Sequence, residues 1–186
     1  MGFYSDEKTA LQYIEMAEGY DGRELVEALR AHLPPGSSVL EIGMGPGVDL
    51  KLLEEYYRVT GSDNSPFFLD RYLEENPGAD LMHLDAVEMD TERTFDGIYS
   101  NKVLHHLTDE ELLKSLHRQK AILSDHGVVL HSFWLGAGID EHHGLRFVYQ
   151  SEDSLRSLFG KMFSVLDIVV YKEMEDDDSA FVLARA

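Results

Sequence analysis

Hydrophobic residues recur along this chain in short runs that are separated by longer stretches with helical spacing. After residue 47, for example, Leu50 and Leu53 repeat on one side of an expected helix, which is the pattern of an amphipathic α-helix. The short runs are typical of buried strands, and they fall at residues 38–42, 58–62, 80–84, 95–100, 127–132, 163–172 and 180–185. The alternation of such strands with helices predicts a parallel sheet that is covered by helices on both faces.

Local sequence signals predict where individual helices begin. Ser65 stands directly before a proline, and Thr108 stands three residues before Glu111. The first pattern is typical of an N-cap with proline at the first helical position, and the second is typical of a capping box. Helices are therefore expected to begin next to residues 65 and 108.

The region before the first strand has helical character of its own. Asp21 and Glu24 mark the start of a helix that is expected to end near His32, before two prolines and a glycine turn the chain into the first strand. The sequence predicts a single domain, with an N-terminal helical cap over residues 1–35 and a seven-stranded α/β core over residues 36–186.

The last two predicted strands are joined by a short loop over residues 173–179. A parallel connection needs a crossover of about a dozen residues or more, so these two strands are expected to pair antiparallel. The predicted fold is a three-layer α/β/α sandwich, with a seven-stranded, mostly parallel sheet and an antiparallel C-terminal hairpin strand.

Composition and charge narrow the choice of partners. The chain has 186 residues, a formal net charge of −19 and no cysteine. An acidic surface repels phosphate backbones and anionic membranes, so neither a nucleic acid nor a membrane partner is expected. The lack of cysteine fits a reducing compartment, and the acidic N-terminus lacks the pattern of a signal peptide. The expected location is the cytoplasm.

Three glycines at alternate positions, Gly43, Gly45 and Gly47, follow the first predicted strand. Glycine adopts positive φ without strain and leaves backbone N–H groups open to a ligand where a strand passes into a helix. A dinucleotide-binding G-x-G-x-x-G turn would place its third glycine at position 48, which is Val48 here. Together with Glu41, the residues instead read E-x-G-x-G-x-G, which favours a nucleotide-type site of another kind.

This pattern resembles the first motif of the class I S-adenosylmethionine-dependent methyltransferases. The resemblance extends from about residue 39 to residue 186, and later motifs follow in the expected order. It implies the class I methyltransferase fold with S-adenosylmethionine as cofactor, and it places Gly43, Gly45 and Gly47 against that cofactor. It also agrees with the predicted antiparallel terminal strand, which dehydrogenases lack.

The resemblance assigns the adenosine part of the cofactor to residues at the ends of the second and third strands. Asp63 would bind the ribose hydroxyls, and its distance along the chain from the glycine turn suits that role; the alternative is a turn residue before Ser65. Asn64 would lie beside the adenine, Asp85 would accept from the adenine amino group, and the backbone N–H of Ala86 would contact the ring.

The methionine end of the cofactor is assigned in the same way. Glu41 would order the glycine turn and approach the methionine amino group, although a buried structural contact is an equal alternative, because a carboxylate within an apolar strand requires a partner. The segment 95–107 resembles the fourth motif of the family, where Ser100 and Asn101 are the expected contacts. Tyr20, from the N-terminal cap, is a candidate lid residue and is expected to bind the cofactor, since an aromatic ring can stabilise a sulfonium.

Five histidines fall at or beyond the carboxyl ends of the fourth and fifth predicted strands. His131 is the candidate general base, since it ends a strand and imidazole titrates near neutral pH. His106 is a weaker catalytic candidate, for which packing or a hydrogen bond is the simpler interpretation. A metal site built from His131, His142 and His143 is chemically reasonable but lacks a fixed ligand spacing, so no metal is predicted.

Aromatic residues after the fifth strand are candidate walls of an acceptor pocket. They are Phe133, Trp134, Phe147 and Tyr149. For Phe147, filling the core is the simpler account.

The function that the sequence predicts is a methyl transfer from S-adenosylmethionine to a small-molecule acceptor. A protein or nucleic acid acceptor would be expected to bring an extra domain or a basic face. The alternative is a non-catalytic module that binds S-adenosylmethionine or S-adenosylhomocysteine. A nicotinamide-dependent dehydrogenase is disfavoured by Val48 and by the terminal hairpin.

Overall fold

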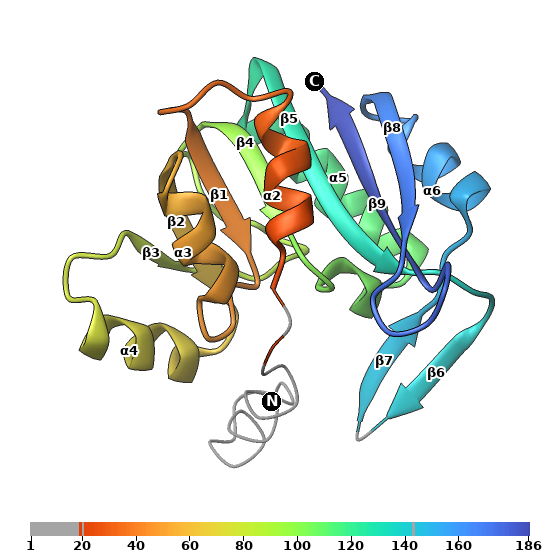
Figure 1. The fold of residues 1–186 in the computed structure, drawn as a ribbon, viewed down its shortest axis with the longest axis horizontal. Helices are drawn as coiled ribbons and strands as arrows, with labels where there is room; N and C mark the ends of the chain where they lie inside the picture. The colour runs from red at the N-terminus through yellow and green to blue at the C-terminus, as the bar shows by residue number, and fades with distance from the viewer. Residues whose placement is uncertain (1–18, 20, 143) are drawn as a thin grey trace.

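One seven-stranded sheet forms the centre of the molecule. The computed structural model describes residue 19, residues 21–142 and residues 144–186. Within these residues the strand order is β3-β2-β1-β4-β5-β9-β8 (Figure 1). The strands are β1 (Ser38–Ile42), β2 (Arg58–Asp63), β3 (Leu81–His83), β4 (Phe95–Ser100), β5 (Leu123–Trp134), β8 (Ser164–Tyr171) and β9 (Ser179–Arg185).

The strand directions confirm the predicted sheet. The pairs β1–β2, β1–β4, β2–β3 and β4–β5 are parallel, whereas β9 runs antiparallel to both β5 and β8. The antiparallel strand is therefore inserted between two strands that share the common direction. This is the fold of the class I methyltransferases.

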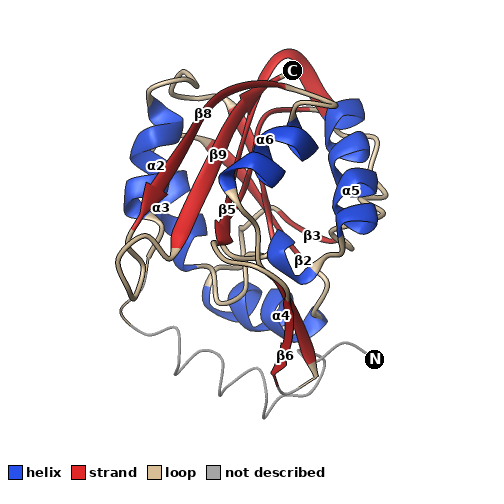
Figure 2. Ribbon diagram, turned by 90° about the vertical axis from the view of Figure 1, so that its right-hand side faces the viewer, coloured by secondary structure: helices blue, strands red, loops and turns tan. Residues whose placement is uncertain are grey.

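Helices cover both faces of the sheet, which makes three layers. They are α2 (Arg23–Arg30), α3 (Val48–Glu54), α4 (Pro66–Glu75), α5 (Asp109–Ile122), α6 (Glu152–Phe159) and the short 3₁₀ helix η2 (Leu104–His106). Figure 2 shows α2 and α3 on one side of the sheet and α5 and α6 on the other. In both views α4 lies near the edge at which the parallel strands end.

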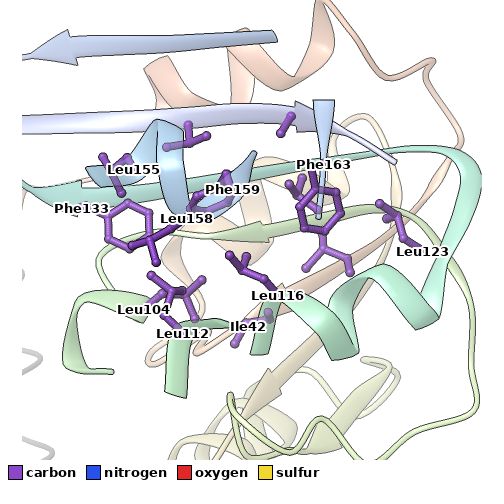
Figure 3. Close-up of a cluster of buried hydrophobic side chains, with 14 of the residues drawn as sticks. Ile42, Leu104, Leu112, Leu116, Leu123, Phe133, Leu155, Leu158, Phe159 and Phe163 are labelled. Atoms are coloured by element: carbon purple, nitrogen blue, oxygen red, sulfur yellow. The ribbon is translucent and has the colours of Figure 1, made fainter. Parts of the chain in front are cut away.

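The larger hydrophobic core lies between the sheet and the pair α5 and α6 (Figure 3). Leu112 and Leu116 of α5 and Phe159 of α6 are fully buried there, together with Phe133 of β5. Alternate strand residues point to the opposite face, where a second cluster joins α2 and α3 to Val39 and other buried residues of the sheet. Burial on both faces explains why most of the strands read as continuous apolar runs.

A small hairpin beyond β5 was not predicted from the sequence. Its strands β6 (Ile139–His142) and β7 (Leu145–Val148) pair antiparallel, with Ile139 opposite Val148. The hairpin includes the charged residues Asp140 and Glu141, and the Ile139 side chain is 63% exposed. Because the hairpin projects from the core, its sequence lacks the apolar run that identifies a buried strand.

The predicted helix starts are confirmed only in part. Thr108 and Glu111 form the expected capping box at the start of α5. Ser65 occupies the N-cap of α4, with proline next, but its side chain makes no capping hydrogen bond. The helix expected to start at Asp21 is present as α2 but begins one residue later, with Gly22 as its N-cap, and Asp21 Oδ1 accepts the N–H of Arg23 at 3.1 Å. Residues 1–18 lie outside the described residues, so the rest of the predicted cap stays a prediction.

None of the helices in the described part of the chain has both the length and the apolar character that a membrane span requires.

The turn between β8 and β9 is organised by one carboxylate. Asp178 accepts backbone N–H groups from Glu173, Met174 and Glu175 at 2.8–2.9 Å. Partial burial raises the pKa of this carboxyl, but the hydrogen bonds outweigh burial and lower the pKa to about 2. The ionised carboxylate therefore closes the turn.

We predict that Asp178→Ala lowers the free energy of unfolding by about 1 kcal/mol, because three backbone donors lose their shared acceptor. Urea denaturation measures this change, and Asp176→Ala, in the same turn, is the matched control. The contribution of Asp178 is fully present above the unfolded-state pKa near 4 and is lost as pH falls toward 2. Equal losses in the two variants would contradict this account of the turn.

Candidate functional site

The candidate site lies where the parallel strands end and the glycine turn begins. Gly43, Gly45 and Gly47 have φ values of +69°, +50° and +80°, so all three adopt the left-handed conformation that glycine tolerates best. Gly47 is also the N-cap of α3. The turn thus has the backbone shape that its sequence predicted.

Neighbouring side chains pack tightly against two of these glycines. A Cβ atom on Gly43 would lie 2.6 Å from a methyl group of Val103, and one on Gly47 would lie 2.3 Å from the Tyr72 ring. Val103 directly precedes η2, and Tyr72 belongs to α4. The glycines therefore allow both segments to lie directly against the turn.

Asp63, the last residue of β2, holds the glycine turn in place. Its Oδ2 accepts the N–H of Gly45 at 2.9 Å, and its Oδ1 accepts the N–H of Ser65 at 2.8 Å. Burial raises the pKa of this carboxyl despite the hydrogen bonds. Each carboxylate oxygen accepts more than one hydrogen bond, so the turn role and the predicted ribose role are compatible.

The residues predicted to bind adenine are brought together near Asp63. The Nδ2 of Asn64 lies 3.4 Å from Oδ2 of Asp85. The other oxygen of Asp85 accepts the N–H groups of Val87 and Glu88 at 2.8 and 3.0 Å, which fixes the turn that contains Ala86. The contacts of these residues with adenine stay a prediction.

Glu41 is buried beneath the glycine turn. Its side chain is 3% exposed, and its Oε2 atom has no hydrogen-bond partner in the described part of the chain. Burial raises the pKa of this carboxyl well above its usual range, and the charges of Asp49 and Asp63 raise it further. A buried carboxylate without a partner costs free energy, so this position is suited to receive a cationic group.

A second carboxylate, Asp49 on α3, connects three segments and was missed in the sequence analysis. Its Oδ1 accepts the N–H of Gly22 at 2.7 Å, and its Oδ2 accepts from Tyr99 Oη at 2.7 Å and Asn101 Nδ2 at 3.0 Å. Asp49 is only 7% exposed. The sequence did contain a signal that Asp49 is buried. Asp49 stands four residues before Leu53, so both lie on the same, buried face of α3.

Asn101 is fixed from both sides. Its Nδ2 donates to Asp49, and its Oδ1 accepts from Ser132 Oγ at 2.6 Å. Ser132 Oγ in turn accepts the backbone N–H of Lys102 at 2.9 Å. The structure thus places Asn101 beside α3, the helix that follows the glycine turn, and connects it to Ser132. The predicted contact of Asn101 with the cofactor stays a prediction.

Two predicted site residues, Ser100 and His131, point away from the glycine turn. Ser100 Oγ lies 2.7 Å from His131 Nδ1, and His131 Nε2 lies 2.8 Å from Gln119 of α5. Both side chains are fully buried, and burial lowers the pKa of His131 to about 3. Both ring nitrogens of His131 are engaged within the core, so the prediction that His131 faces an acceptor as a general base is wrong. The predicted cofactor contact of Ser100 stays a prediction.

Lys102 ties the end of β4 to the β8–β9 turn. Its φ is +53°, and its Nζ donates to Ser179 Oγ at 2.6 Å and lies 3.9 Å from the ring centre of Trp134. Burial lowers its pKa to about 8, although Glu173 at 3.5 Å opposes that shift. Lys102 thereby anchors the segment that carries Asn101.

The two adjacent histidines after β4 occupy different environments. His106 Nδ1 lies 2.6 Å from the carbonyl oxygen of Arg146, and burial lowers the pKa of His106. His105 is 3% exposed, and neither of its ring nitrogens has a hydrogen-bond partner in the described chain. Leaving a buried polar group unsatisfied costs about 1–3 kcal/mol. The catalytic assignment of His106 stays a prediction.

Two predicted residues cannot be placed. Tyr20 and His143 lie outside the described residues, and the side chain of His142 is not described. Among the side chains that are described, no group of three or more His, Asp or Glu residues is placed to bind a metal ion.

Comparisons with known proteins agree with this geometry. Residues 39–127 match a family model described as a methyltransferase domain. The similar solved structures include 1,6-didemethyltoxoflavin-N1-methyltransferase from Burkholderia thailandensis, crystallised with 1,6-didemethyltoxoflavin and S-adenosylhomocysteine. It is 22% identical, with a TM-score of 0.75 over 100% of this chain and 91% of that chain.

Two further solved structures show the same fold. The N-methyltransferase NodS from Bradyrhizobium japonicum WM9 is 17% identical, with a TM-score of 0.71 over 95% of this chain and 97% of that chain. An S-adenosylmethionine-dependent methyltransferase from Clostridium acetobutylicum is 11% identical, with a TM-score of 0.77 over 97% of this chain and 99% of that chain.

We predict that Asp49→Ala lowers the free energy of unfolding by about 3 kcal/mol or more, because it leaves the buried N–H of Gly22 and the Tyr99 hydroxyl without an acceptor. Glu54→Ala, on the exposed side of the same helix, is the control and should change stability by less than about 0.5 kcal/mol. Chemical denaturation measures both. A loss of the same size in the control would show that Asp49 does not connect these segments.

Proposed function

We propose that the chain is a class I S-adenosylmethionine-dependent methyltransferase that transfers a methyl group to a small-molecule acceptor; the match of residues 39–127 to a methyltransferase domain and the shared fold support this. The observation that carries the proposal is the buried, unpartnered Oε2 of Glu41 beneath three left-handed glycines. S-adenosylmethionine carries an ammonium and a sulfonium group, so its charge complements this carboxylate.

The residues around the glycine turn fit such a cofactor. Asp63, with Asn64 and Asp85, would hold the adenosine part, and Glu41 would hold the methionine ammonium. The left-handed backbone of the glycine turn, which carries no Cβ at three positions, would lie against the ligand. When bound, the cofactor supplies a methyl group that is activated by a positively charged sulfur.

The contribution of the chain to such a transfer is mainly positioning. Displacement at a methyl carbon requires the nucleophile, the carbon and the sulfur to lie in line, and fixed geometry can supply much of the rate enhancement. Asp49 and Ser132 hold Asn101 from two sides, and Lys102 anchors the same segment. These contacts form a rigid frame on the side of the glycine turn away from the adenosine residues.

The charge of the chain supports a small acceptor. A net charge of −19 opposes binding to nucleic acid. One similar structure is an N-methyltransferase crystallised with 1,6-didemethyltoxoflavin, a small heterocyclic compound. Both observations favour a small molecule over a nucleic acid.

Turnover can be tested directly. The purified protein is incubated with S-adenosylmethionine labelled in the methyl group and with a panel of small heterocyclic and phenolic compounds, with total RNA and a protein mixture as comparison acceptors. We expect label in at least one small molecule and none in RNA or protein. Labelling of RNA or protein alone would overturn the proposed acceptor class, and binding of cofactor without any transfer would favour a non-catalytic module.

We predict that Glu41→Gln weakens binding of S-adenosylhomocysteine by about 1.5–3 kcal/mol, or roughly 10- to 150-fold in Kd, since a neutral amide replaces the partner of the ammonium group. Isothermal titration calorimetry measures the change. The control ligand is 5′-methylthioadenosine, which lacks the amino acid part and should bind both proteins equally. Equal weakening for both ligands would contradict the ammonium role of Glu41.

The same variant has a predicted effect on stability without ligand. Because burial raises the pKa of Glu41 in the folded protein well above the usual range of a glutamate carboxyl, the folded protein holds this proton at a pH where the unfolded chain has lost it. The stability associated with Glu41 is therefore present at low pH and falls as pH rises above about 4.5. Glu41→Gln should show a smaller fall between pH 4.5 and 8 in urea denaturation; a fall as large as that of the unmodified protein would contradict the assignment.

A further inference from the structure

The segment after β4 places two imidazoles beside the glycine turn. Val103 packs against Gly43, and η2 (Leu104–His106) follows immediately. The adenosine candidates Asp63 and Asp85 follow β2 and β3, which lie on the other side of β1 in the sheet. His105 and His106 therefore stand on the opposite side of the glycine turn from the adenosine residues, where an acceptor would approach.

His105 is a buried polar side chain without a partner. Its ring stacks on Phe147 of β7, with the centroids 5.2 Å apart and an interplanar angle of 23°, and it lies 4.0 Å from the ring of His106. Phe147 covers one face, whereas the two nitrogens on the ring edge make no hydrogen bond within the described chain. Folded proteins rarely leave such groups unsatisfied, so a ligand is the natural partner.

The chemistry of His105 restricts that ligand. Burial lowers the pKa of His105 well below its usual range, and His106 and Lys102 lower it further. The imidazole is therefore neutral and offers one N–H donor and one acceptor nitrogen. A neutral imidazole gives no ionic attraction to a carboxylate or a phosphate, and the net charge of −19 repels both.

The hairpin β6–β7 holds this arrangement in position. A carbonyl oxygen can only accept, so the contact between His106 Nδ1 and the Arg146 oxygen places the proton of His106 on Nδ1. The guanidinium of Arg146 lies 2.9 Å from Glu111, which also forms the capping box of α5 with Thr108. The hairpin is thereby fastened to η2 and to α5, and Phe147 is held against His105.

We propose that His105 binds the methyl acceptor through a hydrogen bond with a ring nitrogen, either the donor N–H or the acceptor nitrogen, and that this contact selects an uncharged acceptor carrying an N–H or O–H group over an anionic one. The inference rests on the proposed methyl transfer and names the acceptor class for that site. His106 and Phe147 are positioning residues that hold the His105 ring in place.

The test uses binding of defined probes to the full chain saturated with S-adenosylhomocysteine. The neutral probe is 2-pyridone, which offers one N–H and one carbonyl, and the anionic probe of similar size is benzoate. NMR follows the ¹⁵N shifts of the His105 ring in the unmodified protein. We expect 2-pyridone to shift these resonances in a saturable way, whereas benzoate should bind at least tenfold more weakly.

The matched variant is His105→Phe, which keeps a flat ring and removes both nitrogens. It should weaken 2-pyridone binding at least tenfold, leave S-adenosylhomocysteine binding unchanged, and raise the urea midpoint, because two unsatisfied polar atoms are lost. The control is His126→Phe, which changes an exposed histidine of β5 and should change neither affinity. A merely structural His105 would give a lower urea midpoint and unchanged probe binding.

The two proposals fail in different ways. If the unmodified protein does not bind S-adenosylhomocysteine, the proposed function fails. If it binds S-adenosylhomocysteine, but 2-pyridone binds equally well to His105→Phe, does not shift the His105 resonances, or binds more weakly than benzoate, the acceptor role of His105 is overturned. The NMR measurement needs no variant, so it decides the question even if His105→Phe does not fold.

Discussion

The carboxylate of Asp63 is the contact on which the shape of the glycine turn depends. It accepts the N–H of Gly45 in the turn and the N–H of Ser65 just before α4. These hydrogen bonds connect the end of β1 to the end of β2. The backbone carbonyl of Ser62 accepts the N–H of Met44, and that of Met44 accepts the N–H of Gly47, but the left-handed turn leaves the N–H of Gly45 without a backbone acceptor in the ladder. A side chain that arrives from the neighbouring strand supplies the acceptor instead.

Three acidic side chains lie close together beneath the turn. Asp63, Asp49 and Glu41 are all buried, and the first two raise the pKa of the third. Asp63 and Asp49 have hydrogen-bond donors around them, whereas one oxygen of Glu41 has none. The ligand-free fold therefore carries an electrostatic cost that a bound cation would offset, which links the stability of this edge to ligand binding.

Much of the fold could be predicted from the sequence because it depends on periodicity and on short signals. The apolar runs identified the seven strands of the sheet, the short loop before Ser179 required an antiparallel partner, and Thr108 with Glu111 marked the start of α5. The hairpin β6–β7 was missed, since its exposed residues carry no hydrophobic run. The glycine turn was recognisable because left-handed backbone requires glycine at these positions.

The site was less predictable because strand residues alternate between two faces. Ser100 and His131 are paired in the sheet, and both point toward α5. Their next neighbours, Asn101 and Ser132, are the ones that join at the site. A one-residue error in placing a strand moves the predicted side chain to the other face of the sheet. The sequence alone does not specify which residue at the end of an apolar run faces the site.

Several unsatisfied buried atoms lie near the glycine turn, a feature that the sequence pattern does not reveal. In the described part of the chain six buried side-chain atoms lack a partner, and four of them belong to Glu41, Tyr72 and His105. Tyr72 packs on Gly47, and Val103, two residues before His105, packs on Gly43. The other two atoms belong to Tyr171 and Arg185, whereas the buried polar pair His131 and Gln119 is satisfied, so most of the unpartnered atoms lie around the glycine turn. The two groups suit different partners. The carboxylate of Glu41 beneath the turn suits a cation, whereas the neutral imidazole of His105 suits an uncharged hydrogen-bonding group.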